Sequence, residues 1–281
     1  MSEFDSKRRD VAVDYANVLK SKQSCCCKEP APKGAVARLA GYSQAELEAL
    51  PPEVVVNSFG CGDPLAFSAV EPGQVVLDLG SGAGIDLLLA ARKVGPQGRV
   101  IGVDMTEEML AAARQNALAA GLSNVELRQG LIEQLPVDDA AVDWVISNCV
   151  INLSPEKDRV FSEIARVLVP GGRMLVADIT AEQLPAEIAG NRRLHSSCLA
   201  GAISQADYLA GLRRAGLQEL EVVDRLVYDA DQIRAFIDGG LHAEDGGCCG
   251  GAPIDPDQAQ RWAAELAGAV ASIKVRGRKP A

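Results

Sequence analysis

The side chains with the most distinctive chemistry in this sequence are its eight cysteines. They form a consecutive triplet, a consecutive pair and three separate positions: Cys25, Cys26, Cys27, Cys248, Cys249, Cys61, Cys149 and Cys198. No Cys-x-x-Cys pair occurs and the chain has only two histidines, which disfavours a zinc site. The N-terminus lacks the apolar core of a secretory signal, so we expect a cytoplasmic protein, and that compartment keeps thiols reduced. The cysteines therefore need a role other than zinc binding or a structural disulfide framework.

A glycine-rich turn carries a second kind of chemistry. The segment Asp78-Leu79-Gly80-Ser81-Gly82-Ala83-Gly84 follows a strand-like run and opens a helix. Its glycines let the backbone approach a ligand without a Cβ clash. The dinucleotide fingerprint would require a glycine at position 85, which is Ile85, so pyrophosphate binding is disfavoured. The turn predicts another nucleotide-type cofactor.

An acidic residue stands where such a cofactor would present its ribose. Asp104 ends the second predicted strand, 20 residues after Gly84, and its carboxylate can accept hydrogen bonds from both ribose hydroxyls. The alternative is a generic glycine-rich turn with a solvated aspartate. Because strand, loop and acid occur in the required order, we favour cofactor binding.

The elements that must position these residues form an alternating pattern. From Gly73 to Asp178, short β-branched runs alternate with alanine-rich helical segments, which is typical of βαβ units. The predicted strands are 75–78, 100–104, 125–128, 142–147 and 174–177, and the predicted helices are 87–93, 107–120 and 157–167. This pattern predicts an α/β fold with a doubly wound, mainly parallel, Rossmann-like sheet.

Less regular segments flank this region. Helices are predicted over 8–24 and from Ser43 to just before Pro51, forming an N-terminal helical lid. Beyond Asp178 we expect a C-terminal α+β extension with helices over 205–215, 231–237 and 257–270 and a strand over 221–228. The basic tail, 274–280, is expected to be frayed.

Charge and hydropathy exclude some partners. The formal net charge of -10 provides no electrostatic footprint for a phosphate backbone, so no nucleic-acid partner is expected. The most apolar stretches, 85–91 and 142–150, are too short or too interrupted to span a bilayer. We therefore expect the protein to act on a small molecule. We also expect it to be a monomer.

Residues 73–178 resemble the class I S-adenosylmethionine methyltransferases. The resemblance rests on Val76-Leu77-Asp78-Leu79-Gly80-Ser81-Gly82-Ala83-Gly84, on the strand-ending Asp104 and on the turn Leu168-Val169-Pro170-Gly171-Gly172-Arg173. It implies that the methionine end, the ribose and the adenine contact nine residues: Asp78, Gly80, Gly82, Gly84, Asp104, Met105, Ile132, Glu133 and Asn148. Ile132 also fits simple core packing.

Four further motifs resemble the arsenite methyltransferases. They are Tyr15-Ala16-Asn17-Val18-Leu19-Lys20, Ser58-Phe59-Gly60-Cys61-Gly62-Asp63-Pro64, Ile146-Ser147-Asn148-Cys149-Val150-Ile151-Asn152-Leu153 and Cys198-Leu199-Ala200-Gly201-Ala202. The resemblance implies that Cys61, Cys149 and Cys198 hold As(III) through thiolates, the soft donors that suit a thiophilic substrate. It also implies three parts: a cysteine-bearing segment (1–70), a cofactor-binding domain (71–180) and an arsenic-binding C-terminal region (181–281).

The remaining cysteines have redox or accessory roles in this reading. The resemblance implies that the triplet contains the redox partner cysteine without deciding which member it is; Cys26 and Cys27 are our candidates, with thioredoxin or glutathione as external reductant. Cys248 and Cys249, among glycines, are interpreted as an auxiliary pair that collects As(III), the alternative being passive cysteines. A lone cysteine such as Cys149 is also commonly just a small buried apolar residue.

Two other functions compete with arsenic methylation. A small-molecule O- or C-methyltransferase would share the fold and would need a base, for which Glu133 and Asp178 are conceivable. A metalloid-binding protein without catalysis would not need the cofactor loop. The cysteine motifs disfavour the first and the intact loop disfavours the second.

Overall fold

The computed structural model describes residues 3–20, 42–48, 50–51, 54–55, 60, 62–63, 65, 68–196, 198–238 and 254–281. Of the cysteines, Cys149 and Cys198 lie within these ranges. Cys25, Cys26, Cys27, Cys61, Cys248 and Cys249 lie outside them.

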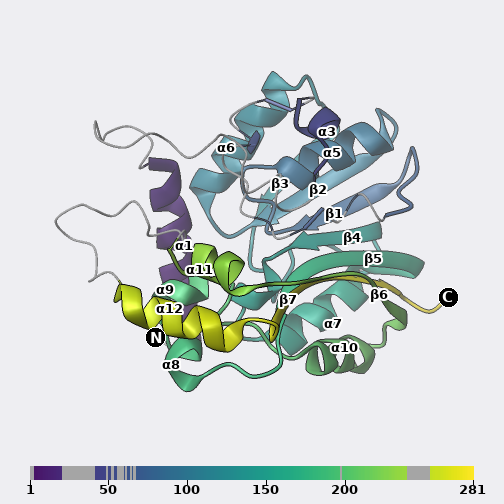
Figure 1. Cartoon of the computed structure of the whole chain (residues 1–281). Coiled ribbons are helices and arrows are strands. Elements are labelled where there is room, and N and C mark those ends of the chain that lie inside the picture. Colours follow the sequence, from purple (N-terminus) through teal and green to yellow (C-terminus); the bar gives the residue numbers. More distant parts are fainter. Residues whose placement is uncertain are drawn as a thin grey trace.

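A seven-stranded sheet forms the centre of the protein, in the order β3-β2-β1-β4-β5-β7-β6 (Figure 1). The strands are β1 (Val75–Leu79), β2 (Arg99–Asp104), β3 (Val125–Gln129), β4 (Val142–Asn148), β5 (Leu168–Ala181), β6 (Gln218–Val227) and β7 (Val270–Arg278). The first five strands pair in parallel, whereas β7 is antiparallel to both β5 and β6. The predicted doubly wound, mainly parallel sheet is confirmed.

Helices cover both faces of the sheet because successive strand residues point to opposite sides. Val76 packs in the cluster that includes Leu87 and Ala91 of α5 (Ile85–Val94), together with Ala113 of α6 (Glu107–Ala119). Leu77 packs in the cluster that contains Phe161 of α7 (Lys157–Val167), together with Tyr208 of α10 (Gln205–Arg214). The strands are apolar on both faces, as expected for a parallel sheet that is covered on two sides.

A third layer of helices gathers at one end of the sheet (Figure 1). It includes α1 (Glu3–Lys20), α8 (Ala186–Ala189), α9 (Arg192–Ser196), α11 (Ala230–Asp238) and α12 (Pro256–Leu266). Their apolar side chains form one cluster that also contains Cys149 and Cys198. Both cysteines therefore lie in a largely apolar environment.

Two short elements complete the described fold. Helix α3 (Gln44–Glu48) lies at the predicted capping box, and the turn η3 (Ile151–Leu153) follows β4.

The prediction for the C-terminal tail is wrong. Residues 270–278 form β7, which is inserted between β5 and β6, and the preceding helix ends at Leu266 rather than at Val270. The basic residues that suggested a frayed tail pair with acidic residues of β6: Lys274 Nζ lies 3.1 Å from Asp224, and Arg276 pairs with Glu221. Neutralising these charges allows a basic segment to occupy an inner strand.

The expected division into 1–70, 71–180 and 181–281 stays a prediction, although β6 and β7 complete the sheet that β1 to β5 begin. Within the described ranges, no helix is both long enough and apolar enough to cross a membrane.

Candidate active site

One pocket opens where β1, β2 and β4 end. All nine residues expected to contact the cofactor line it: Asp78, Gly80, Gly82, Gly84, Asp104, Met105, Ile132, Glu133 and Asn148. Cys149 lines it as well. Ligands of open α/β sheets bind at this carboxyl edge, where the strand order reverses between β1 and β4. The structure therefore brings the predicted cofactor residues together, while their individual roles stay predictions.

The glycine loop has a backbone that other residues adopt poorly. Gly80 and Gly84 have φ values of 64° and 100°. A Cβ added to Gly80 would lie 2.3 Å from the Val150 side chain, so this position is also sterically closed. The loop brings bare backbone to the pocket wall next to Cys149.

Acidic side chains give the pocket an affinity for cations. Asp78 is buried, and its Oδ2 atom has no hydrogen-bond partner in the structure. Burial, followed by repulsion from Asp86 and Asp104, raises the pKa of Asp78 well above its usual value. A buried carboxylate of this kind is costly unless a ligand supplies a cation or a donor. S-adenosylmethionine, with its ammonium and sulfonium groups, fits that requirement.

Two backbone N–H groups orient the side chain of Asp104. Its Oδ2 accepts the Gly82 N–H at 3.0 Å and its Oδ1 accepts the Thr106 N–H at 2.8 Å. Burial raises the pKa of Asp104, and these two N–H donors oppose the change. Each oxygen has a further lone pair, so the side chain can still accept the two ribose hydroxyls.

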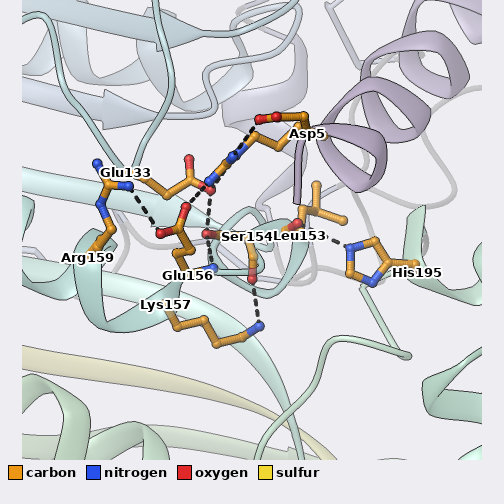
Figure 2. Close-up of polar contacts among 9 residues, drawn as sticks. Asp5, Glu133, Leu153, Ser154, Glu156, Lys157, Arg159 and His195 are labelled. Carbon is orange, nitrogen blue, oxygen red and sulfur yellow. Dashed lines mark hydrogen bonds and ion pairs between the residues drawn. The ribbon is translucent and has the colours of Figure 1, made fainter. Parts of the chain in front are cut away.

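Glu133 lies at the rim of the pocket in a network of charged groups. Its Oε1 accepts a hydrogen bond from Ser154 Oγ at 2.7 Å and from Arg8 Nε at 3.1 Å. Arg8 also pairs with Glu156, to which Arg159 donates at 3.1 Å. Figure 2 shows the labelled Glu133, Ser154 and Glu156 converging on this point. Helix α1 is therefore fastened to the rim.

Asn148 joins the end of β4 to the segment around position 61. Its side chain accepts the Gly62 N–H at 3.1 Å and donates to the Gly62 carbonyl at 2.5 Å. It also donates to Tyr42 Oη at 2.9 Å. A Cβ added to Gly60 would lie 2.2 Å from Asn148 Nδ2. Both glycines that flank Cys61 in the sequence therefore lie beside the residue that precedes Cys149.

Cys149 and Cys198 are neighbours in space although they are far apart in sequence. Both are buried, and the Cys198 thiol donates to the Cys149 carbonyl, with 2.6 Å between sulfur and oxygen. Each has a left-handed backbone, with φ of 58° and 66°. Such conformations are uncommon outside glycine and are enriched at functional sites. Cys149 is disulfide-bonded, but not to Cys198, whose thiol is free.

An acidic and a basic side chain, Asp178 and Lys157, act electrostatically on Cys198. Asp178 is fully buried, accepts the Ile179 N–H at 3.0 Å and the Tyr208 hydroxyl at 3.3 Å, and has its pKa raised to about 7 by burial. Lys157 donates to the Ser154 carbonyl at 3.0 Å. Burial lowers the pKa of Lys157, while electrostatic interactions with Asp178 and Cys198 raise it by a smaller amount. Burial, followed by repulsion from Asp178, raises the pKa of the Cys198 thiol well above its usual value. The thiol is therefore protonated at neutral pH.

The comparisons with known proteins agree with this geometry. The methyltransferase domain family matches residues 70–216. An arsenite methyltransferase from Halobacterium salinarum is 40% identical over 235 residues, which are 79% of this chain and 60% of that protein. One from Aquipseudomonas alcaligenes is 37% identical over 222 residues, 75% of this chain and 62% of that protein. The chain thus spans about 60% of the length of these curated relatives.

A solved structure extends the match. The arsenic (III) S-adenosylmethionine methyltransferase from Chlamydomonas reinhardtii superposes with a TM-score of 0.59 at 32% identity, covering 90% of this chain and 75% of that one. This chain belongs to the arsenite methyltransferase family. The resemblance drawn from the four sequence motifs is confirmed.

For this arsenite methyltransferase family member, several predicted site residues stay predictions. Cys61, the candidates Cys26 and Cys27, and the pair Cys248 and Cys249 lie outside the described residues. Within the described ranges, no group of three or more His, Cys, Asp or Glu side chains could hold a metal ion.

The sequence predicted a helical lid in this region but not the residues of α1 that line the pocket. Arg8, Val11 and Tyr15 line it alongside the cofactor loop. Their spacing of three and four residues places them on one helical face, which is the signal that could have found them. Asp86 in the first turn of α5 was also missed, since an acid at a helix start is usually assigned to the helix dipole.

Proposed function

We propose that this protein transfers methyl groups from S-adenosylmethionine to trivalent arsenic held by cysteine thiolates, and so detoxifies arsenite. One observation carries the proposal: Cys149 lines the same acidic pocket as Asp78 and Asp104. The Cys149 carbonyl also accepts a hydrogen bond from the Cys198 thiol, with 2.6 Å between sulfur and oxygen. Membership of the arsenite methyltransferase family supports it.

Three cysteines hold the substrate in this proposal: Cys61, Cys149 and Cys198. The motif Ser58-Phe59-Gly60-Cys61-Gly62-Asp63-Pro64, which resembles the arsenite methyltransferases, supports including Cys61. Arsenous acid, As(OH)₃, is neutral, and each thiol proton can leave with one hydroxide as water. A buried, protonated thiol such as Cys198 therefore exchanges ligands with no net charge entering the apolar cluster.

The bound cofactor supplies an electrophilic methyl group on a sulfonium. The residues of the chain supply position: Asp78 and Asp104 hold the cation and its ribose, and the three thiolates leave the arsenic lone pair directed at the pocket. No proton is removed from the acceptor. Neither conceivable base suits a proton-bearing acceptor, since Glu133 is bonded by Arg8 and Ser154 and Asp178 is not among the residues that line the pocket.

Methylation withdraws two electrons from arsenic, so the cycle needs a reductant. Two thiolates return these electrons by forming a disulfide, and an external dithiol then reduces that disulfide by exchange. We assign the cysteine triplet, through Cys26 or Cys27, to this redox step and thioredoxin or glutathione to the external one. The disulfide at Cys149 fits a site that cycles between thiol and disulfide. We propose that the protein works as a cytoplasmic monomer, divided into 1–70, 71–180 and 181–281, with Cys248 and Cys249 as an auxiliary arsenite pair.

The proposal is tested by incubating purified protein with arsenite, S-adenosylmethionine and either the thioredoxin system or glutathione, and then separating the arsenic species. Methylated arsenicals are expected, together with one S-adenosylhomocysteine per methyl group. The control is Cys149→Ser, which should release none. Methylated arsenic from that variant at the wild-type rate would contradict the thiolate mechanism. No methylated arsenic from the wild-type protein would contradict the proposed function and favour an ordinary O- or C-methyltransferase.

A further inference from the structure

Helix α1 is bonded to both halves of the candidate active site. At the cofactor rim, Arg8 Nε donates to Glu133 Oε1 at 3.1 Å, and the guanidinium also pairs with Glu156. Glu133 lines the cofactor pocket, and Val11, one turn further along α1, lines it too. A ligand in this pocket therefore touches α1 as well as the glycine loop.

The same helix is bonded to the segment that carries Cys198. Asp14 Oδ2 accepts the Ser196 hydroxyl at 2.5 Å, and Tyr15 Oη donates to the Ser196 carbonyl at 3.4 Å. Ser196 is buried and stands two residues before Cys198. The Cys198 N–H donates to the His195 carbonyl at 3.0 Å. The backbone at Cys198 therefore belongs to the turn whose Ser196 is hydrogen-bonded to α1.

The turn after β4 supplies a second connection. Ser154 Oγ donates to the carboxylate oxygen of Glu133 that Arg8 uses, at 2.7 Å, and the neighbouring Leu153 carbonyl lies 3.2 Å from His195 Nε2. Figure 2 shows Glu133, Ser154, Leu153 and His195 in this sequence. Cys198 itself is not among the residues that line the cofactor pocket. The Cys149 carbonyl, which accepts the Cys198 thiol, gives one route from the pocket to Cys198, and the connections through α1 and the turn after β4 give two more.

We propose that α1 couples the two sites, with Arg8 and Ser196 as positioning residues that bring Cys198 into place when the cofactor pocket is filled. The inference rests on the proposed function and adds that cofactor binding prepares the arsenic site. A ligand that contacts Val11 and Tyr15 favours the docked state of α1, and docked α1 fixes Ser196 and with it the backbone of Cys198. By linkage, bound arsenic then strengthens cofactor binding by the same factor.

Hydrogen exchange tests the coupling without arsenic and without catalysis. Adding S-adenosylhomocysteine to the wild-type protein should slow amide exchange in residues 80–84, in α1 and in 198–202. At a concentration of S-adenosylhomocysteine that saturates each variant, Arg8→Gln should still show slowed exchange at 80–84 and should lose the slowing in α1 and 198–202. The matched control is Arg159→Gln, which also removes a partner of Glu156 but does not lie on α1, and it should behave as wild type.

Arsenite affinity provides the second measurement. S-adenosylhomocysteine should tighten arsenite binding to the reduced wild-type protein at least about 5-fold, the lower end of typical coupling between sites. Arg8→Gln and Ser196→Ala should each remove the tightening while leaving arsenite affinity without cofactor unchanged. Arg8→Lys, which keeps one donor and the charge, should restore part of it.

Several outcomes would overturn the inference. They are no effect of S-adenosylhomocysteine on exchange at 198–202 in wild type, full coupling in Arg8→Gln, or equal loss of coupling in Arg159→Gln. These failures are distinct from failure of the proposed function. A protein that binds both ligands with coupling but methylates nothing contradicts the function alone, whereas one that methylates arsenite without coupling contradicts only the role of α1.

Discussion

The two halves of the candidate active site are built differently. The cofactor half comes mainly from one stretch, 78–133, in which strand, glycine loop, helix and acid follow one another along the chain. The acceptor half is assembled from α1, the end of β4 and the turn after it, and the segment around Cys198. The cofactor half contains a buried polar atom without a hydrogen-bond partner, Asp78 Oδ2, whereas the acceptor half places the sulfur atoms of Cys149 and Cys198 in an apolar cluster. One half is suited to holding a cation and the other to holding a neutral, soft substrate.

The largest expected effect concerns the acceptor half, which should not function after losing one cysteine ligand. Cys198→Ser should lower arsenite methylation at least about 1,000-fold, because two thiolates do not hold As(III) with its lone pair directed and a hard hydroxyl is a poor replacement. Affinity for S-adenosylhomocysteine should stay within a few-fold of wild type, since Cys198 does not line that pocket. Rates are measured by separating arsenic species and affinities by titration calorimetry. Methylation at even a tenth of the wild-type rate would refute three-thiolate binding.

The reverse experiment targets the cofactor half. Asp104→Ala should weaken cofactor binding at least about 100-fold, because two hydrogen bonds to a charged acceptor contribute roughly 1.5 to 3 kcal/mol each. Gly80→Ala should have a comparable effect, since its Cβ would meet Val150 at 2.3 Å. Arsenite binding measured without cofactor should be unchanged in Asp104→Ala. Glu107→Ala, an exposed acid on the neighbouring helix, is the control; parallel loss of both affinities in folded Asp104→Ala would show that the halves are not separate.

A pH experiment tests the effect of burying Asp178, which acts electrostatically on Cys198 in the acceptor half. The pKa of Asp178 is raised to about 7, so the folded state retains a proton that the unfolded state releases near its usual value. The stability that this proton confers is present at low pH and is lost as pH rises through about 7. The free energy of unfolding should therefore fall by about 2 kcal/mol more in wild type than in Asp178→Asn between pH 5 and 7. Urea unfolding at both pH values measures this, and identical slopes for the two proteins would count against it.

The smallest expected effect concerns Cys248 and Cys249. Replacing both with serine should raise the KM for arsenite several-fold and leave kcat unchanged, because a collecting pair improves capture at scarce substrate without orienting it. Initial rates over a range of arsenite, with excess methyl donor and reductant, separate the two parameters. An unchanged KM would make these cysteines passive, and a collapsed kcat would move them into the catalytic site.

The residues predicted for the cofactor half gather at one pocket, and the sequence could indicate them because their signals are local. Gly80, Gly84 and Asp104 have meaning within a single βαβ unit, and the structure brings them to one pocket. The acceptor half could be reached only through resemblance, since nothing local connects Cys149 with Cys198. The bonds from Arg8 to Glu133 and from Asp14 to Ser196 join residues more than 100 positions apart, and no periodicity encodes such pairs.

The C-terminal strand was missed for a similar reason. Lys274 and its basic neighbours indicate solvent when they are considered alone. They fit an inner strand only because β6 brings acids such as Asp224 opposite them, and this pairing depends on the register of two strands.

The placement of β7 has a consequence for synthesis of the protein. Strand β6 is translated before β7, and among the described strands β7 is its pairing partner. At about 5 to 20 residues per second, β6 is therefore synthesised seconds before its neighbour exists, and it has an unpaired edge during that time. Leu226 and Val227 of this strand are exposed even in the complete fold. During that interval the nascent chain is a substrate for chaperones and a template for wrong strand pairing. Slow codons between positions 228 and 269 would lengthen that interval and lower the yield of folded protein without changing a single residue.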